Sequence, residues 1–556
     1  MVQLSRRAFL EIGGRAGIIA ASGAGTLLSS SRETLAADKT VLDARQRRQR
    51  AYQIRHDAAQ RYLAESLISH RSNGDGDRYE DKRASFSKTL PHNDIGEVDP
   101  QAYAAWLSIL RSGDPIKFER VPRHPEAELK LNDPQACYAF DLVGVDSHAT
   151  HLDPPPTFAS AAMASEMAEL YWQALLVDVP FRQYDSHPLA AAAIADLNGF
   201  SHSLTLGSDH KVTVDTLFRG ETIGARVGPY ISQFLLLEVP YGIGRIEQKY
   251  RFPTRGQNFM VEYSEWIACQ NGKRPATKLQ FDAQPRFICS NRELAEFVHQ
   301  DFSFQAYMNA ALIMLSLGEE ALSPTNPYGG SKTQFGDITF GSKNVLSLLA
   351  QAALLAQKGA YFHKWLVHRR LRPESFGGRI ETHLSGRKTY DIHSEILSCD
   401  AVARVKAAAG TRLLPMAYPE GCPTHPAYPA AHATNAGACA TVLKAFFRRD
   451  FVIPKPVQAS ADGSALEPWS GTNLVLGNEI DKLAENIVLA RDAAGVHFRS
   501  DSIQGLRVGE EQAIGILQDY SRTYNERFDG FVLTKFDGTT VEITNGRVRL
   551  IQGRSP

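Results

Sequence analysis

Helical periodicity is the feature that most restricts the fold of this 556-residue chain. Over long stretches, apolar residues recur every three to four positions, which is typical of amphipathic helices. Regular alternation of apolar and polar residues stands out only at 531–543, where Asp537-Gly538 predicts a hairpin turn. The sequence therefore predicts an all-α protein with a small β element near its C-terminus. The expected helices cover residues 41–64, 158–176, 294–317, 345–368, 431–447, 480–494 and 503–524.

A chain of this length exceeds one ordinary hydrophobic core, so we expect two or three packed units. The Gly-rich and polar run at residues 326–339 is the best candidate for a boundary between two helical parts. The sequence thus predicts an N-terminal helical domain at residues 38–330 and a C-terminal helical bundle at residues 331–525. A C-terminal β-hairpin extension occupies residues 526–556.

Residues 1–37 have the features of an export signal. Arg6-Arg7 forms a twin-arginine pattern, a weakly apolar stretch follows at residues 16–28, and Ala36-Ala37 offers a cleavage point. The alternative is a basic tail without structure. The signal predicts that the folded protein is exported by the twin-arginine route to the periplasm or the extracellular space.

Charge and cysteine content argue against several other classes of protein. The chain carries 61 basic and 61 acidic residues, so no excess of positive charge favours a nucleic-acid partner. Its six cysteines never occur at CxxC spacing, which argues against a zinc site or a dithiol motif. One or two disulfides are compatible with export, but the sequence does not pair the cysteines. No later segment has about eighteen consecutive apolar residues, so we expect no membrane span.

Three cationic segments in the C-terminal half are candidates for holding one anion. The first ends a long apolar helix, in which Lys364 and His368 lie four residues apart and share a face. Pro373 disfavours helical geometry at Arg372, so we expect the helix to stop there, with Arg372 curling toward the same point. The alternative for such a cluster is a solvated face that complements the helix dipole.

The second segment runs from His425 to His432 and opens a predicted helix. Free backbone N–H groups at a helix start form an anion site, and Pro429 fixes the approach to it. His432 lies in the first turn, where a general acid or base facing that anion belongs. A capping or packing histidine is the alternative.

The third segment contains Arg491, His497 and Asp501. Arg491 falls in the last turn of a helix that Gly495 is expected to break, and His497 follows six residues after Arg491. Asp501 is placed to hold an imidazole or an arginine in position. An ordinary helix-end salt bridge is the alternative.

The three segments are more informative together than apart. Lys364, Arg372 and Arg491 supply three positive charges, and His432 and His497 supply two imidazoles. This set fits an oxyanion with two or three negative charges, because a buried anion of that kind requires compensating charge.

The order of these residues resembles the signature of the vanadium haloperoxidases and of the related type 2 phosphatidic-acid phosphatases. The shared elements are Lys…Arg-Pro, Pro-x-x-His and Arg…His…Asp. The spacing from Lys364 to Arg372 is similar to that of the bacterial and algal branch of the haloperoxidases. The similarity extends over most of the mature chain, through residues 363–378 and the upstream segments 165–172, 218–220 and 228–234.

The resemblance implies two four-helix bundles, with orthovanadate held in the C-terminal one. It implies that His497 is the axial ligand to vanadium and that Lys364, Arg372 and Arg491 neutralise the vanadate oxygens. His432 would be the acid–base histidine, and His425 a second histidine beside the site.

The activity that the resemblance implies is oxidation of a halide by hydrogen peroxide to a hypohalous-acid equivalent, which halogenates an organic acceptor. Bromide is the favoured halide, because His363 and His425 keep the site polar, as in the algal branch. Family members commonly form dimers or larger assemblies, so we expect a homo-oligomer.

One departure from the family pattern concerns the cofactor. The family usually has Ser-Gly before the acid–base histidine, whereas this chain has Ala430-Ala431. Ala430 lacks the hydroxyl, whose hydrogen bond to a charged acceptor is worth roughly 1.5–3 kcal/mol. Vanadate binding should weaken by roughly one to two orders of magnitude unless a water replaces that bond. Ala431 keeps the backbone N–H that contacts the cofactor.

Two other functions fit the same residues. An acid phosphatase would use His497 as the nucleophile of a phosphohistidine intermediate and His432 to protonate the leaving group. A non-catalytic helical protein would bind phosphate or vanadate without turnover. Vanadate should inhibit the phosphatase, and substitution of His432 should leave a pure binder with no turnover to lose.

Overall fold

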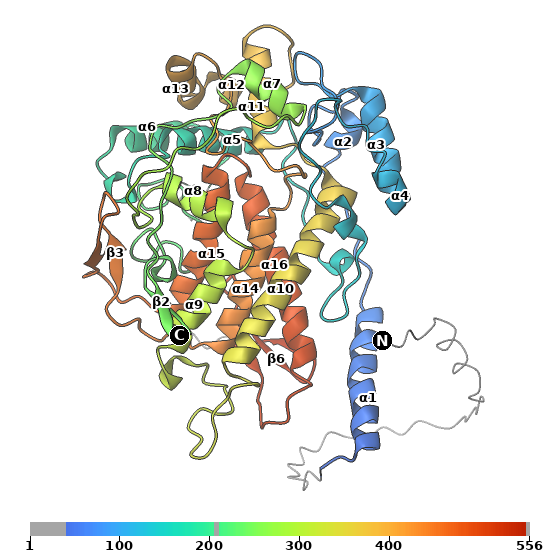
Figure 1. Ribbon diagram of the computed structural model, residues 1–556, viewed down its shortest axis with the longest axis vertical. Coiled ribbons are helices and arrows are strands. Elements are labelled where there is room, and N and C mark those ends of the chain that lie inside the picture. Colours follow the sequence, from blue (N-terminus) through green and yellow to red (C-terminus); the bar gives the residue numbers. More distant parts are fainter. Residues whose placement is uncertain (1–40, 205–210, 552–556) are drawn as a thin grey trace, which may run out of the picture. The chain divides into compact units, whose positions relative to one another are not determined.

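The computed structural model describes residues 41–204 and 211–551 (Figure 1). The chain divides into a short unit that ends at Gln53 and a main unit that begins at Ile54. The first helix crosses this division in the sequence, and every other described helix and strand belongs to the main unit. The predicted export signal at residues 1–37 lies outside the described residues.

Helices dominate the described residues, so the prediction of an all-α protein is confirmed. The longer helices are α1 (Ala44–Leu63), α3 (Pro100–Ser112), α5 (Ala161–Leu175), α6 (Pro188–Leu197), α7 (Tyr263–Gln270), α8 (Asn291–Gln300), α9 (Gln305–Leu315), α10 (Ser342–Phe362), α11 (Pro373–Leu384), α13 (Asp400–Ala409), α14 (Ala431–Phe446), α15 (Leu476–Ala493) and α16 (Arg499–Tyr520). The short α-helices are α2 (Asp75–Arg78), α4 (Pro115–Phe118) and α12 (Ser394–Ser398). The 3₁₀ turns are η2 (Pro134–Tyr138), η3 (Ser147–Ala149), η4 (Phe181–Gln183), η5 (Gln233–Leu235) and η6 (Glu319–Ala321).

Six of the seven predicted helices occur within a few residues of their expected bounds, as α1, α5, α10, α14, α15 and α16. The prediction of one helix at 294–317 was wrong. The chain forms α8 and α9 instead, because Asp301 is extended, with φ −66° and ψ 153°, and ends α8. Helices α3, α6, α7, α11 and α13 were not predicted from the sequence.

Three small antiparallel sheets complete the fold. They pair β1 (Val239–Tyr241) with β2 (Gly244–Ile246), β3 (Val457–Ala459) with β4 (Leu466–Pro468), and β5 (Phe531–Thr534), β6 (Thr540–Thr544) and β7 (Arg547–Leu550) in that order. The predicted hairpin around Asp537-Gly538 is confirmed and gains a third strand. Asn545 and Gly546, both with positive φ, connect β6 to β7, and Asn-Gly is the strongest short hairpin signal.

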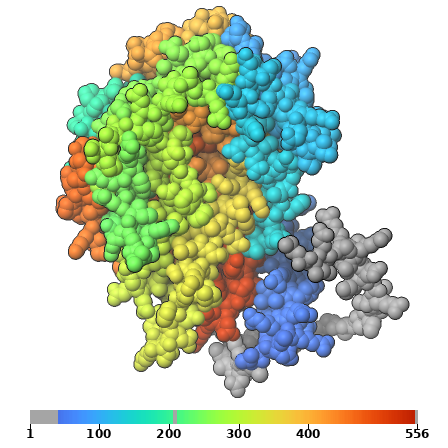
Figure 2. All heavy atoms as spheres, viewed as in Figure 1, coloured from blue at the N-terminus to red at the C-terminus, as the bar shows by residue number. Residues whose placement is uncertain are grey.

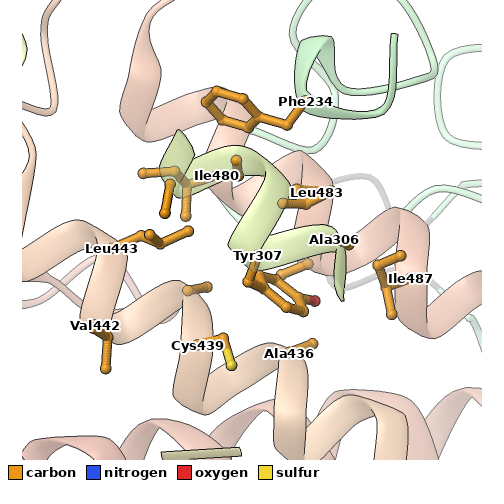
Figure 3. Packing of buried hydrophobic residues seen from close by; sticks show 14 of the residues in the cluster. Phe234, Ala306, Tyr307, Ala436, Cys439, Val442, Leu443, Ile480, Leu483 and Ile487 are labelled. Carbon is orange, nitrogen blue, oxygen red and sulfur yellow. The ribbon is translucent and has the colours of Figure 1, made fainter. Parts of the chain in front are cut away.

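The four helices α10, α14, α15 and α16 pack side by side as a bundle (Figure 1). In Figure 3, Ala436, Cys439 and Leu443 of α14 lie on one face, three and four residues apart. They meet Ile480, Leu483 and Ile487, which follow the same helical spacing on α15. Tyr307 of α9 closes this core from a third side. The core therefore joins residues from before and after position 330, and the predicted domain boundary stays a prediction.

Helices α14 and α16 approach each other more closely than side chains would allow. A Cβ atom at Gly437 would overlap the Leu506 carbonyl, and one at Gly509 would overlap the Thr434 carbonyl. The Ala430 amide also donates to the Asp501 carbonyl at 3.0 Å, where both helices begin. The two helices therefore start from a common point with their backbones in contact.

One helical segment, Ser342–His368, is long and apolar enough to span a membrane by length and composition, but half of its most apolar window is buried inside the protein. This segment is a core element of the bundle. All six cysteines are buried and unpaired, so the structure contains none of the disulfides that the sequence left open.

Candidate active site

Lys364 lies on a π-helical turn, η7 (His363–His368), that continues α10. Its side chain is fully buried, and Nζ donates to the carbonyls of Pro426 and Ala427, both at 2.8 Å. Burial lowers the pKa of Lys364 well below its ordinary value, and the nearby Arg372 and Arg491 add to this effect. A π turn inside an α-helix is uncommon and frequently marks a functional site.

The helix stops before Pro373, at the end of the predicted range 345–368. The helix ends at His368, and Arg369 takes a left-handed conformation with φ 47°. Arg372 is extended, with φ −92° and ψ 157°, as a residue before proline should be. Pro373 then begins α11, because proline is favoured in the first turn of a helix.

Arg372 connects the three cationic segments. Its buried guanidinium donates to the carbonyl of His425 at 2.8 Å and to that of Val496 at 2.7 Å. It also contacts Nε2 of His497 at 3.0 Å and Nδ1 of His425 at 2.9 Å. His425 and His497, which the sequence proposed from two other segments, therefore meet at this side chain.

His497 is held from behind by Asp501, with Nδ1 2.9 Å from Oδ2 of the carboxylate. Burial lowers the pKa of His497 well below its ordinary value, and Arg372 and Lys364 lower it further. The imidazole is therefore neutral, with the Nδ1 proton facing Asp501 and the Nε2 lone pair facing Arg372. This is the tautomer that a metal ligand or a nucleophile requires.

Arg491 lies in the last turn of α15, as predicted, and is buried. It donates to the carbonyl of Val298 at 2.9 Å and lies over the ring of Tyr418 at 5.6 Å. Its Nε is buried without a partner in the described residues. Its charge acts on His497, Arg372 and Lys364, which places it in the same group.

His432 lies in the first turn of α14 and is the most accessible member of the group, with 24% of its side chain exposed. Its Nε2 lies 2.8 Å from Oδ1 of Asp301, so Nδ1 remains as its proton acceptor. Ala430, the N-cap residue, has no side chain that could cap the amide groups of this turn. In Figure 2 the surface is hollowed between green and cyan segments, with orange and red residues at the floor.

His425 is buried against Arg372, and its ring lies 5.5 Å from that of Tyr361. Burial lowers the pKa of His425 well below its ordinary value, as do Lys364 and Arg372. His363 does not join this group, because its contacts are with Thr150, His70 and His368. The polarity on which the preference for bromide was based therefore comes from His425 and not from His363.

Sequence reasoning missed Asp301, which holds the acid–base candidate in place. The signal was a short break, Asp301-Phe302-Ser303-Phe304, within what looked like one helix. It also missed Arg370, whose guanidinium lies 2.7 Å from Asp501 and 3.2 Å from Glu166. Arg370 and Arg372 therefore have different partners.

The charge balance of the group fits an oxyanion. Lys364, Arg372 and Arg491, which we call the open cations, have carbonyl, histidine and tyrosine partners, and no carboxylate within the described residues forms an ion pair with any of them. Three buried cations without counter-charge are costly unless an anion joins them. Together with the uncapped turn of α14, they fit a tetrahedral oxyanion such as vanadate.

Comparisons with known proteins agree with this geometry. Residues 397–526 match the family described as the VCPO second helical-bundle domain. The chain is 36% identical over 490 residues to a vanadium-dependent bromoperoxidase of Ascophyllum nodosum, covering 83% of this chain and 88% of that protein. It is 34% identical to one of Corallina pilulifera, covering 83% and 91% of the two chains.

A solved structure is similar over nearly the whole length. The homohexameric second vanadate-dependent bromoperoxidase of Ascophyllum nodosum superimposes with a TM-score of 0.87 and 28% sequence identity. The match covers 95% of this chain and 96% of that chain.

Proposed function

The chain belongs to the family of vanadium-dependent bromoperoxidases, and on that premise we propose which of its residues carry out the oxidation of bromide by hydrogen peroxide. The observation that supports the proposal is the group of three buried cations without carboxylate partners beside a neutral, anchored His497. Most other buried cations in the described residues are paired with carboxylates, as Arg370 is, whereas Arg379 donates only to the carbonyls of Ile95 and Gly96.

The open cations would hold the oxygens of vanadate, and the Ala431 backbone N–H would add a neutral donor. His497 would bind vanadium through Nε2, the atom whose lone pair now faces Arg372. When bound, vanadate supplies a Lewis-acidic centre that activates peroxide toward a halide. The donors fit it because they combine charge, directed N–H groups and one imidazole.

His432 would accept and then donate the proton of the reaction. Its Nε2–H faces Asp301, so the free Nδ1 can accept a proton from incoming hydrogen peroxide and later return it. The Asp301 carboxylate keeps this tautomer and stabilises the imidazolium while it carries the proton. The net reaction, in which bromide, hydrogen peroxide and one proton give hypobromous acid and water, needs such a donor. His425, fully buried and neutral, would polarise the same region without exchanging protons with solvent.

The experiment is halogenation of a cyclic diketone by vanadate-stripped protein with peroxide and bromide, before and after vanadate is added. Activity that appears only with vanadate supports the proposal, and His432→Ala should lower it by roughly 10²–10⁴-fold. Silence at saturating vanadate would contradict it. Vanadate-inhibited phosphate release would then favour the phosphatase alternative, which the comparisons do not favour.

We also propose that Ala430 lowers the affinity of the site for vanadate. Without a hydroxyl at the N-cap of α14, vanadate should bind more weakly than in an Ala430→Ser variant. The difference should be roughly 10- to 100-fold, the worth of one hydrogen bond to a charged acceptor. Equal dissociation constants, measured by titration of both proteins, would show that a water replaces the hydroxyl.

Export and assembly complete the proposal. The twin-arginine pattern supports passage to the periplasm or beyond, which fractionation of cells expressing the chain and an Arg6→Lys/Arg7→Lys variant would test. The homohexameric relative supports a homo-oligomer, and light scattering of the purified protein would give its mass.

A further inference from the structure

A cavity lies beside Asp301, the residue that holds His432, and none of the open cations lines it. It has a volume of about 660 Å³, and its walls come from residues 249–252, from Phe281 and Pro285, and from the end of α8 with the start of the connection to α9. Asp301 lines it and also holds His432 at 2.8 Å. The cavity therefore adjoins His432, the proposed acid–base residue.

Aromatic rings form much of its surface. Phe252 and Phe297 are buried, and the Tyr250 ring lies 5.9 Å from the first and 5.8 Å from the second. Phe281 is 41% exposed at the edge. The Tyr250 hydroxyl is buried and has no hydrogen-bond partner in the described part of the chain. Such walls suit a flat aromatic ring that carries a polar substituent.

The two cations of the cavity, Lys249 and Arg251, lie together on its 249–252 wall. Lys249 lies over the Phe287 ring at 5.4 Å, and Arg251 donates to the Asp282 carbonyl at 3.0 Å. Within residues 41–204 and 211–551, neither forms an ion pair with a carboxylate. The two carboxylates of the cavity are already engaged: Asp301 with His432, and Glu296 with His299 at 3.1 Å. An anionic group is therefore attracted to the 249–252 wall.

We propose that this cavity binds the organic halogen acceptor, and that the acceptor is an electron-rich aromatic carboxylate, such as a hydroxybenzoate. The inference rests on the proposed function, which supplies hypobromous acid from bromide, peroxide and a proton. The carboxylate lies toward Lys249 and Arg251, and the ring lies toward His432. An electron pair of the ring forms the C–Br bond as the O–Br bond breaks, and the ring proton leaves with the hydroxide as water.

Competition between two acceptors tests this inference. 4-Hydroxybenzoate and its methyl ester share a ring but differ in charge, so reagent hypobromous acid gives a fixed ratio of their brominated products. The vanadate-loaded enzyme should shift that ratio toward the acid by about fivefold, which corresponds to one solvent-screened charge contact of about 1 kcal/mol. A ratio equal to that of the reagent would overturn the inference.

The double variant Lys249→Gln/Arg251→Gln should return the ratio to the reagent value. It should leave the oxidation of iodide to triiodide unchanged, because neither residue belongs to the vanadate site. Lys332→Gln, an exposed lysine outside the cavity, is the matched control and should keep the shifted ratio. A shift that survives the double variant would also overturn the inference.

Binding without turnover separates this inference from the proposed function. Saturation-transfer NMR on vanadate-free protein should detect 4-hydroxybenzoate with the wild-type chain and a signal weaker by about fivefold with the double variant. Absence of vanadate-dependent iodide oxidation would contradict the proposed function, whereas equal NMR signals from both proteins would contradict the acceptor site.

Discussion

Arg370 and Arg372 stand two residues apart, both are almost completely buried, and they have opposite surroundings. Arg370 contacts the carboxylates of Glu166 and Asp501. Arg372 contacts carbonyls and the imidazoles of His425 and His497. Between these two neighbours, the carboxylate partners therefore separate the arginine that is paired within the protein from the one that is available to an anion.

The same contrast in surroundings separates Arg499 from Lys364. Arg499 bonds Glu169 through Nε at 2.8 Å, and the surrounding carboxylates raise its pKa despite complete burial. We call Arg370 and Arg499 the paired cations. Burial lowers the pKa of Lys364, an open cation, because the charge of Asp501 does not outweigh the loss of water and the repulsion from Arg372. The paired set stabilises the fold, and the open set is available to a ligand.

The largest expected effect is the loss of stability when a paired cation is replaced. Arg370→Met leaves the carboxylates of Glu166 and Asp501 buried without their partner, so the free energy of unfolding should fall by about 3–5 kcal/mol. Urea denaturation of the vanadate-free protein measures it. A loss below about 1 kcal/mol would show that Arg370 does not neutralise those carboxylates.

Arg372→Met is the matched change in the open set. Vanadate affinity should fall by roughly 10- to 100-fold, because a charge-assisted hydrogen bond is worth roughly 1.5–3 kcal/mol. The free energy of unfolding should fall less than in Arg370→Met, since no buried carboxylate is left unpaired. Calorimetric titration with vanadate and urea denaturation give the two values. Equal losses of stability in Arg370→Met and Arg372→Met would contradict the distinction between paired and open cations.

Lys364→Met should change stability still less. Loss of the hydrogen bonds to the Pro426 and Ala427 carbonyls opposes relief from burying an unpaired ammonium. The net change in the free energy of unfolding without vanadate should be within about 1 kcal/mol. Added vanadate should stabilise the wild type more than the variant, as thermal unfolding with and without the anion would show.

The smallest expected effect is the pH dependence of His299, which carboxylates also pair. Burial opposes its charge, but hydrogen bonds to Glu296 and Glu420 outweigh burial and raise its pKa from 6.5 to about 9. The stability that it contributes is thus fully present below pH 6.5 and is lost as the pH rises through 9. Urea denaturation across this range should show a decline that His299→Gln reduces. An unchanged decline would assign it to other groups.

The sequence was informative where chemistry depends on residue type and order. Lys364, Arg372, Arg491, His432 and His497 were all proposed from motifs, and the structure brings them together. It was less informative where partners are distant in sequence. Asp301 lies 131 residues from His432, and no local pattern links them. The π turn that carries Lys364 was also missed, because apolar spacing does not separate a π turn from an α turn.

The close approach of α14 and α16 has a consequence for how the protein can change over time. His432 begins one helix and Asp501, which anchors His497, begins the other, and the spacing between the helices is fixed by main chain against main chain at Gly437 and Gly509. Side chains elsewhere in the bundle can be exchanged for others of similar volume without altering that spacing. The distance between His432 and His497 should therefore stay the same while other core residues are replaced during evolution. Substitutions at Gly437 and Gly509 should be poorly tolerated, although neither glycine contacts the reactants.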